Sequence, residues 1–270
     1  MIVDVALPSA APRGAGALIV NADDWGRDRR TTNRILDCAR GGGVSAVSGM
    51  VFMDDSERAA SIARERGLDT GLHLNVTLPF TSRACPAALL THQRRLVGYL
   101  RRHPLARVVY NPRLAESFRY VVAAQLDEFR RLYDAAPERI DGHHHMHLCA
   151  NVQFQRLLPA GTLVRRNFSF QRGEKSAWNR FYRRLGDAML SRRHRVVDYL
   201  FPLAPVEPVA RLQRIFSLAR EFVVEVETHP VNRLEHRFLA RGEIFRQAGD
   251  VRIAAPSSLR AARPHVSIGS

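Results

Sequence analysis

The sequence predicts an α/β fold in which strands alternate with helices. Short apolar runs rich in β-branched residues recur along the chain and are typical of buried strands. Segments with apolar residues at helical spacing separate these runs between residues 17 and 254. This order indicates a largely parallel sheet covered by helices, either open and doubly wound or closed as a barrel. The seven or eight strands expected in one domain favour the barrel.

The first elements are delimited by the polar and glycine residues that end each apolar pattern. The run ALIV, followed by polar Asn21, predicts a strand at residues 17–21. Apolar residues recur on one face of residues 32–40 and predict a helix, which the glycines at 41–43 end. The run at 46–52 is again typical of a strand.

The middle of the chain continues this alternation. Ser56 is expected to cap a helix that Gly67 ends, before a short strand at residues 71–74. Residues 116–133 carry apolar side chains at helical spacing and give the longest predicted helix. A proline then breaks the chain before a strand at 139–141.

The rest of the chain repeats the pattern of short apolar runs and amphipathic segments. One of the helices expected here is strongly basic. The predicted elements are a helix after Val152, a strand at 163–165, the basic helix at 177–191, a strand at 197–201, a helix at 209–220, a strand at 222–227, a helix at 241–247 and a last strand at 251–254.

A single domain is expected, because no internal repeat, low-complexity segment or linker divides the chain. It covers residues 17–256, between a flexible N-terminal tail at 1–16 and a C-terminal tail at 257–270. Residues 80–112 are rich in Arg, Pro and His, and we expect a long loop or insertion over the functional site there.

The composition is that of a soluble globular protein, with 46% apolar and 25% charged residues. No apolar run approaches the roughly 18 residues that span a bilayer, and the N-terminal stretch does not match a signal peptide. We therefore expect a cytoplasmic protein. Cys38, Cys85 and Cys149 are too scattered for a disulfide framework and are expected to be reduced.

The net charge of +15 favours an anionic partner of some kind. The basic residues form no basic-aromatic repeat of a nucleic-acid-binding module, so no specific nucleic acid is expected. The basic helix and the arginines up to residue 195 suggest peripheral contact with anionic lipid or with a lipid-linked substrate. The oligomeric state, a homodimer included, is left open.

Polar residues follow four of the predicted strands, at residues 21–24, 71–73, 141–147 and 227–230. The carboxyl ends of parallel strands meet at one rim, so these side chains are expected to converge. The adjacent carboxylates of Asp23 and Asp24 would repel each other without a cation or a shared proton. Mixed imidazole and carboxylate ligands suit zinc or another divalent transition ion better than calcium.

The segment from His143 to His147 contains four histidines within five positions, which packing alone does not explain. If it is extended, His143, His145 and His147 point one way and His144 the other. At least one of these rings then contacts another ligand or the substrate. Which of His144, His145 and His147 does so is left open.

At these four clusters the sequence resembles the YdjC-like carbohydrate deacetylases, the group that includes chitooligosaccharide deacetylase. The resemblance spans about residues 17–254. Trp25 stands where phenylalanine is more usual and Gly142 where serine is common, and neither change touches the suspected ligands. The motifs that carry the resemblance are LIVNADDWG at 18–26, GLHL at 71–74, DGHHHMH at 141–147 and THP at 228–230.

The resemblance implies an irregular (β/α) barrel, TIM-barrel-like, that removes an N-acetyl group from an N-acetylglucosamine-type sugar with one divalent metal ion, Mg²⁺ or Zn²⁺. Carried over by position, it implies Asp24, His73 and His143 as metal ligands. Asp23 is then the general base and His229 the general acid, which suits amide hydrolysis by an activated water.

Four further residues are expected to line the sugar site: Trp25, Asn75, His145 and Arg165. Arg165 follows a predicted strand, although a surface ion pair is an equally good interpretation of it. Two other functions remain open. One is a metal-dependent phosphoesterase, and the other is a non-catalytic protein that binds glycan or nucleic acid and holds a structural metal.

Overall fold

The computed structural model describes residues 16–102, 105–170 and 174–259. Seven strands form one sheet, and all neighbouring pairs are parallel. The predicted tails lie almost entirely outside the described residues. The strands are β1 (Ala17–Trp25), β2 (Ala46–Gly49), β3 (Thr70–Leu74), β4 (Arg139–Gly142), β5 (Leu163–Val164), β6 (Tyr199–Pro202) and β7 (Val223–Thr228).

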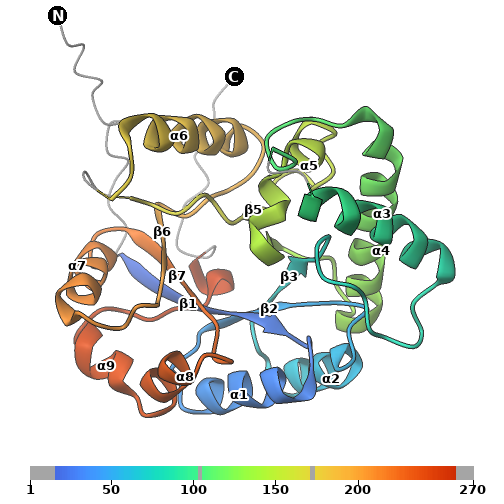
Figure 1. The fold of residues 1–270 in the computed structure, drawn as a ribbon. Coiled ribbons are helices and arrows are strands. Elements are labelled where there is room, and N and C mark those ends of the chain that lie inside the picture. The colour runs from blue at the N-terminus through green and yellow to red at the C-terminus, as the bar shows by residue number, and fades with distance from the viewer. Residues whose placement is uncertain (1–15, 103–104, 171–173, 260–270) are drawn as a thin grey trace, which may run out of the picture.

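The strand order β5-β4-β3-β2-β1-β7-β6 places β2 at the centre of a curled sheet, with β1 between β2 and β7. Figure 1 shows helices packed around the outside of the curl. Among the described residues no ladder joins the edge strands β5 and β6, and Leu163 forms only an isolated bridge with Arg195. The fold is therefore α/β with a curled parallel sheet, and the expected closed barrel is not seen.

The helices lie between the strands, as the sequence pattern predicts. The basic helix and the long helix at 116–133 are found almost as expected. The described helices are α1 (Arg29–Arg40), α2 (Ser56–Arg66), α3 (Ala87–Arg102), α4 (Ala115–Tyr133), α5 (Ala150–Phe154), α6 (Ala177–Ser191), α7 (Val209–Ala219), α8 (Arg233–Ala240) and α9 (Glu243–Ala248), with 3-10 turns η1 (Pro112–Leu114), η2 (His143–Leu148) and η3 (Pro256–Leu259).

Two large apolar clusters hold the helices against the sheet. The first contains Leu18 and Val226 from the central strands and packs them against helices α1, α7, α8 and α9. The second contains Leu72 from β3 with Phe118 and Phe129 from α4. Both clusters draw on strands of the same sheet, so the strand ends are fixed relative to one another.

Several predicted elements differ from the structure. Residues 80–112, where a long loop or insertion was expected, contain the 16-residue helix α3, whose Leu89 and Leu96 are buried. The predicted last strand at 251–254 forms only one bridge, between Ile253 and Leu18. From Asn21 onward, β2 pairs with β1 and leaves no further room on that edge. In the part of the chain that is described, no helix is long and apolar enough to cross a membrane.

Candidate active site

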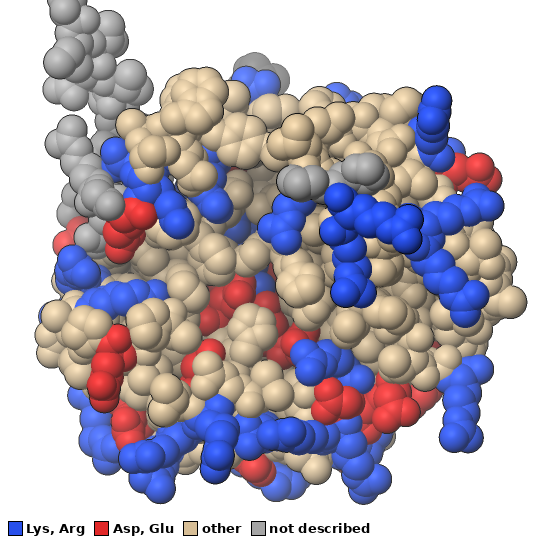
Figure 2. Space-filling view, viewed as in Figure 1, with Lys and Arg blue, Asp and Glu red and all other residues tan. Residues whose placement is uncertain are grey.

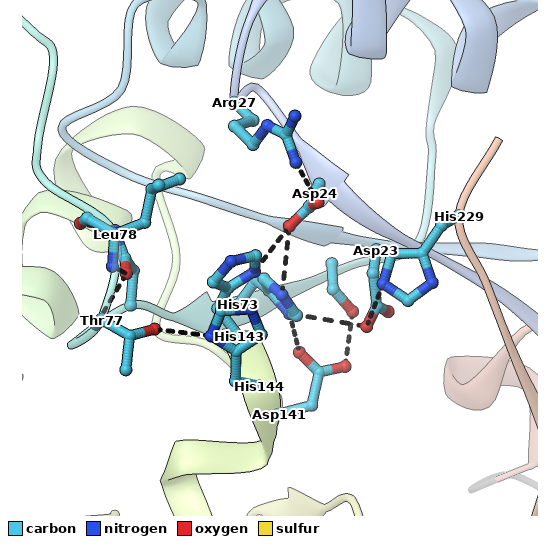
Figure 3. Close-up of polar contacts among 12 residues, drawn as sticks. Asp23, Asp24, Arg27, His73, Thr77, Leu78, Asp141, His143, His144 and His229 are labelled. Carbon is cyan, nitrogen blue, oxygen red and sulfur yellow. Dashed lines mark hydrogen bonds and ion pairs between the residues drawn. The ribbon is translucent and has the colours of Figure 1, made fainter. Parts of the chain in front are cut away.

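The four polar clusters meet at the carboxyl ends of β1, β3, β4 and β7, as predicted. Parallel register brings them together, because His73 lies opposite Asp141 and Ala22 lies opposite Thr228. Figure 3 shows Asp23, Asp24 and the imidazoles of this group pointing toward one another. The strand ends therefore build one shared site.

Asp24, His73 and His143 form a group that could hold a metal ion. One ligand atom from each lies within 4.8 Å of the others. The Asp24 Oδ1 atom is 3.0 Å from His143 Nδ1 and 3.4 Å from His73 Nε2. His73 Nε2 is buried and has no hydrogen-bond partner among the described residues. A buried imidazole nitrogen without a hydrogen-bond partner is a suitable position for a metal ligand, so these donors suit the implied metal.

The backbone of Asp24 explains how two adjacent carboxylates reach the same site. Neighbouring side chains of a regular strand point to opposite faces. Asp24 has a φ of 68°, and the pairing of β1 with β2 shifts register between Ala22 and Trp25. The other carboxylate oxygen of Asp24 accepts a hydrogen bond from Arg27 at 2.8 Å. Burial alone would raise the pKa of Asp24, but its contacts with His143 and His73 hold that pKa well below the usual range.

His73 is oriented by a carboxylate on its second nitrogen. Its Nδ1 atom lies 2.8 Å from Asp141 Oδ1 and 3.9 Å from Asp23 Oδ2. A carboxylate in this position fixes a ligand imidazole and increases its basicity. Burial alone would lower the pKa of His73, but Asp23, Asp141 and Asp24 raise it to about 10. Sequence reasoning gave Asp141 no role, although it stands at the end of a predicted strand.

Arg165 lies behind these groups with its guanidinium buried. Its expected contact with the sugar does not fit this position, because the side chain is buried and its guanidinium is paired with four carboxylates of the protein. Its nitrogens lie 2.6 and 2.7 Å from the two oxygens of Asp23, 2.8 Å from Asp141 Oδ2, 2.8 Å from Glu225 Oε1 and 3.0 Å from Glu227 Oε2.

Asp23 and His229 lie on the opposite side of His73 from Asp24. His229 Nε2 is 3.9 Å from Asp23 Oδ2, and the His229 side chain is 38% exposed. The backbone N–H of His229 donates to Glu235, whose buried carboxylate also accepts from Thr228. With a scissile bond held between them, a buried carboxylate can accept a proton on one side while a half-exposed imidazole donates a proton to the leaving group on the other.

The histidine cluster turns back on itself instead of running straight. The expectation of an extended segment is wrong, because His144 and His145 both adopt positive φ within η2. The His144 ring is hydrogen-bonded to the hydroxyl of Thr77. The His145 ring packs against Phe168, and its Nε2 atom lies 3.4 Å from Glu227. The buried His147 donates from Nε2 to the carbonyl oxygen of Arg165, and burial lowers its pKa to about 4.

Trp25 and Asn75 do not line the site. Trp25 is fully buried in the first apolar cluster, because the register shift before it turns its side chain toward the core. Asn75 is also fully buried, and its side chain bonds to the backbone of Thr77 and Leu78. Trp25 therefore belongs to the core, and Asn75 holds the loop that follows β3.

Glu227 is a further group of the site that sequence reasoning did not assign. Burial, followed by repulsion from Asp23, raises its pKa to about 8, although Arg165 opposes this shift. Glu225 precedes it by two positions on β7 and points to the same face. The signal in the sequence was the pair of glutamates that alternates with valines in an otherwise apolar strand.

Relatives of this chain include several deacetylases. The carbohydrate deacetylase of Danio rerio is 30% identical over 145 residues, which cover 53% of this chain and 45% of that protein. The carbohydrate deacetylase of Homo sapiens is 34% identical over 140 residues, covering 50% and 42%. The chitooligosaccharide deacetylase of Proteus mirabilis is 32% identical over 139 residues, covering 51% and 53%. The chain spans about half the length of these curated relatives.

A solved structure supports the fold. A crystal structure from Enterococcus faecalis V583, described as a candidate cellobiose-phosphate cleavage protein, superposes with a TM-score of 0.62 at 18% identity and covers 91% of this chain and 99% of that one. A family model described as YdjC-like protein matches residues 17–237. This match takes in every strand and all four clusters, and it confirms the resemblance seen in the sequence: the chain belongs to the YdjC-like family.

Proposed function

We propose that the protein is a metal-dependent hydrolase that removes an N-acetyl group from an N-acetylglucosamine-type sugar or oligosaccharide. The observation that carries this proposal is the placement of Asp23 and His229 beside the group formed by Asp24, His73 and His143. Relatives named carbohydrate deacetylase and chitooligosaccharide deacetylase support the same reaction class.

A divalent cation bound by Asp24, His73 and His143 would supply Lewis-acid polarisation of the acetyl carbonyl and a water of lowered pKa. In this proposal Asp23 accepts the proton of the attacking water. In this proposal His229 protonates the departing amine, because its ring is partly exposed and lies 3.9 Å from Asp23. The acetyl C–N bond then breaks to give acetate and the free amino sugar.

Arg165 has a positioning role in this proposal. Its guanidinium donates hydrogen bonds to both oxygens of Asp23, which fixes the orientation of the carboxylate. Arg165 also joins Asp23 to Asp141, so the proposed base and the carboxylate that orients His73 move together.

The other two functions fit this arrangement less well. A two-metal phosphoesterase needs a second cation site. The two remaining groups of possible ligands share Asp23, so neither offers a set of ligands separate from the proposed base. A structural metal in a binding protein is usually enclosed by four protein ligands, whereas this group offers three and lies beside an ionisable base and acid.

The test is acetate release from N-acetylglucosamine oligosaccharides by metal-stripped protein, with and without added Zn²⁺ or Mg²⁺. We expect release only with a cation. His143→Ala should abolish both cation binding and release, while His92→Ala, a half-buried histidine of α3, should alter neither.

Asp23→Asn and His229→Ala separate catalysis from metal binding. Each should keep the cation and lower kcat by roughly 10²–10⁴-fold, because each removes a proton-transfer group. Asp54→Asn, an exposed carboxylate in the loop between β2 and α2, is the matched control. Wild-type protein that binds a cation tightly but releases acetate from no sugar would contradict the proposal.

A further inference from the structure

Helix α6 carries an exposed stripe of large apolar side chains. Trp178, Phe181, Tyr182, Leu185 and Met189 are between 51% and 75% exposed. Their spacing of three, four, seven and eleven residues from Trp178 places them on one face of the helix. The rings of Trp178 and Phe181 stack with their centroids 5.8 Å apart. Isolated apolar side chains are common on surfaces, but a continuous stripe of this size marks an interaction surface.

The opposite face of α6 fastens the helix to the protein body. Asp187 is buried and accepts hydrogen bonds from Arg166 and Asn167, which follow β5. Leu190 is buried in the second apolar cluster. The stripe is therefore held outward by contacts on the other side of the helix and does not result from loose packing.

Basic residues flank the stripe. Residues 175–195 contain seven Lys or Arg and a single acidic residue, Asp187, whose carboxylate is already paired with Arg166. Arg184 and Arg192 are exposed. In Figure 2 the upper edge over α6 is mostly tan, with Lys and Arg side chains beneath it. A second copy of this chain, which carries a net charge of +15, would meet this basic region with like charge.

We infer that α6 docks in the plane of a membrane surface that contains anionic lipid. Aromatic and apolar side chains on one face, with arginines beside them, match a helix that inserts its apolar side among the headgroups while its basic side chains reach lipid phosphates. The seven positive charges select an anionic surface over a zwitterionic one.

A series of ring contacts connects this helix to the active site. Arg183 of α6 lies over the ring of Phe170, at 5.0 Å from its centroid. Phe170 contacts Phe168, and Phe168 contacts the site residue His145. Docking through α6 would therefore hold the opening of the site close to the lipid surface. The docking itself requires no assumption about the reaction.

The two tryptophans of the chain provide a direct readout. Trp25 is buried in the core, whereas Trp178 lies on the stripe and is 75% exposed. With vesicles of phosphatidylcholine and phosphatidylglycerol, we expect the emission of Trp178 to shift to the blue and to be quenched by lipids brominated near the headgroup. Vesicles of phosphatidylcholine alone should produce neither change.

Variants separate the apolar contribution from the charge. Phe181→Ser with Leu185→Ser should abolish the fluorescence change, while Phe154→Ser, an equally exposed aromatic on α5, should preserve it. Arg184→Ser and Arg192→Ser should each weaken vesicle partitioning about fivefold, because each basic residue near an anionic membrane contributes about that factor. Acetate release from a short water-soluble sugar should stay unchanged in all of them.

Three results would overturn the inference: no vesicle binding by the wild type, equal binding to both lipid compositions, or a blue shift that depends on protein concentration without lipid. The last result would instead identify a second copy of the chain on the stripe. Because vesicle binding is measured without substrate, its failure is distinct from a failure of the proposed deacetylase reaction.

Discussion

At the scale of single residues, Asp141 connects the two halves of the site. Its Oδ1 atom lies 2.8 Å from His73 Nδ1. Its Oδ2 atom lies 2.8 Å from Arg165 and accepts a hydrogen bond from Ser48 at 2.6 Å. Burial alone would raise the pKa of Asp141, but Arg165 and His73 hold it well below its usual range. It therefore stays charged and acts on the cation group through His73.

Asp141→Asn should weaken cation binding by about 10–100-fold, because the neutral amide is a poorer acceptor for the imidazole that it orients. Titration calorimetry with Zn²⁺ measures this change. Asp127→Asn on the exposed face of α4 is the control. Unchanged affinity in Asp141→Asn would show that His73 needs no such support.

Glu227 should make the metal-free protein less stable as pH rises. Its pKa is raised from 4.5 to about 8 in the folded state, so the folded protein holds a proton that the unfolded chain releases. The stabilisation is complete below about pH 4.5 and is lost as pH rises through about 8. Glu227→Gln should flatten this dependence and raise Tm by about 2–4 °C at high pH, on the basis of about 1 kcal/mol. Parallel Tm curves for the two proteins in chelator would contradict this.

At the scale of elements, the cap of α1 also supports the site. Asp28 accepts hydrogen bonds from both the backbone N–H and the hydroxyl of Thr31. Its second oxygen also accepts from Arg27, which in turn donates to Asp24. A single carboxylate therefore ends the loop after β1, starts a helix and steadies a residue beside an expected ligand.

Asp28→Ala should lower the free energy of unfolding by about 1 kcal/mol, the usual effect of losing an N-cap. For a chain of this size that corresponds to a fall in Tm of about 2–4 °C. Asp37→Ala, in the exposed part of the same helix, should have a much smaller effect. Equal losses in the two variants would exclude a specific capping role.

Strands and helices were predictable where burial has a regular period. The long helix α4 was found because Val121, Val122 and Phe129 recur at helical spacing. The short helix α8 was missed, because Gly242 and the mixed polarity of Arg233–Ala240 obscure its pattern. The residues of η2 were misassigned, since nothing in a run of histidines reveals that two of them adopt positive φ.

The same limit applies to the site. Residues that end a strand were identified from sequence because the parallel topology alone brings them to one edge. Arg165 also ends a strand, but whether it faces solvent or the carboxylates depends on the curl of the sheet. The position of Trp25 depends on a register shift of one strand, which residue types do not encode.

At the scale of the whole molecule, the two apolar clusters share one continuous sheet. We therefore expect a single unfolding transition for the metal-free protein. Leu18→Ala in the first cluster and Leu72→Ala in the second should each cost about 2–5 kcal/mol and lower the midpoint of that same transition. Two separable calorimetric transitions would show that the chain folds as two units.

The position of β7 beside β1 has a consequence during synthesis. Asp24, His73 and His143 all precede residue 150, but the second edge of β1 is closed only when Val223–Thr228 pairs with it. Until then the ribosome-bound chain presents an apolar strand with unpaired backbone groups, which is a template for aggregation. Fragments that stop before β7 should accordingly require chaperones or form inclusion bodies, even though they carry all three expected ligands.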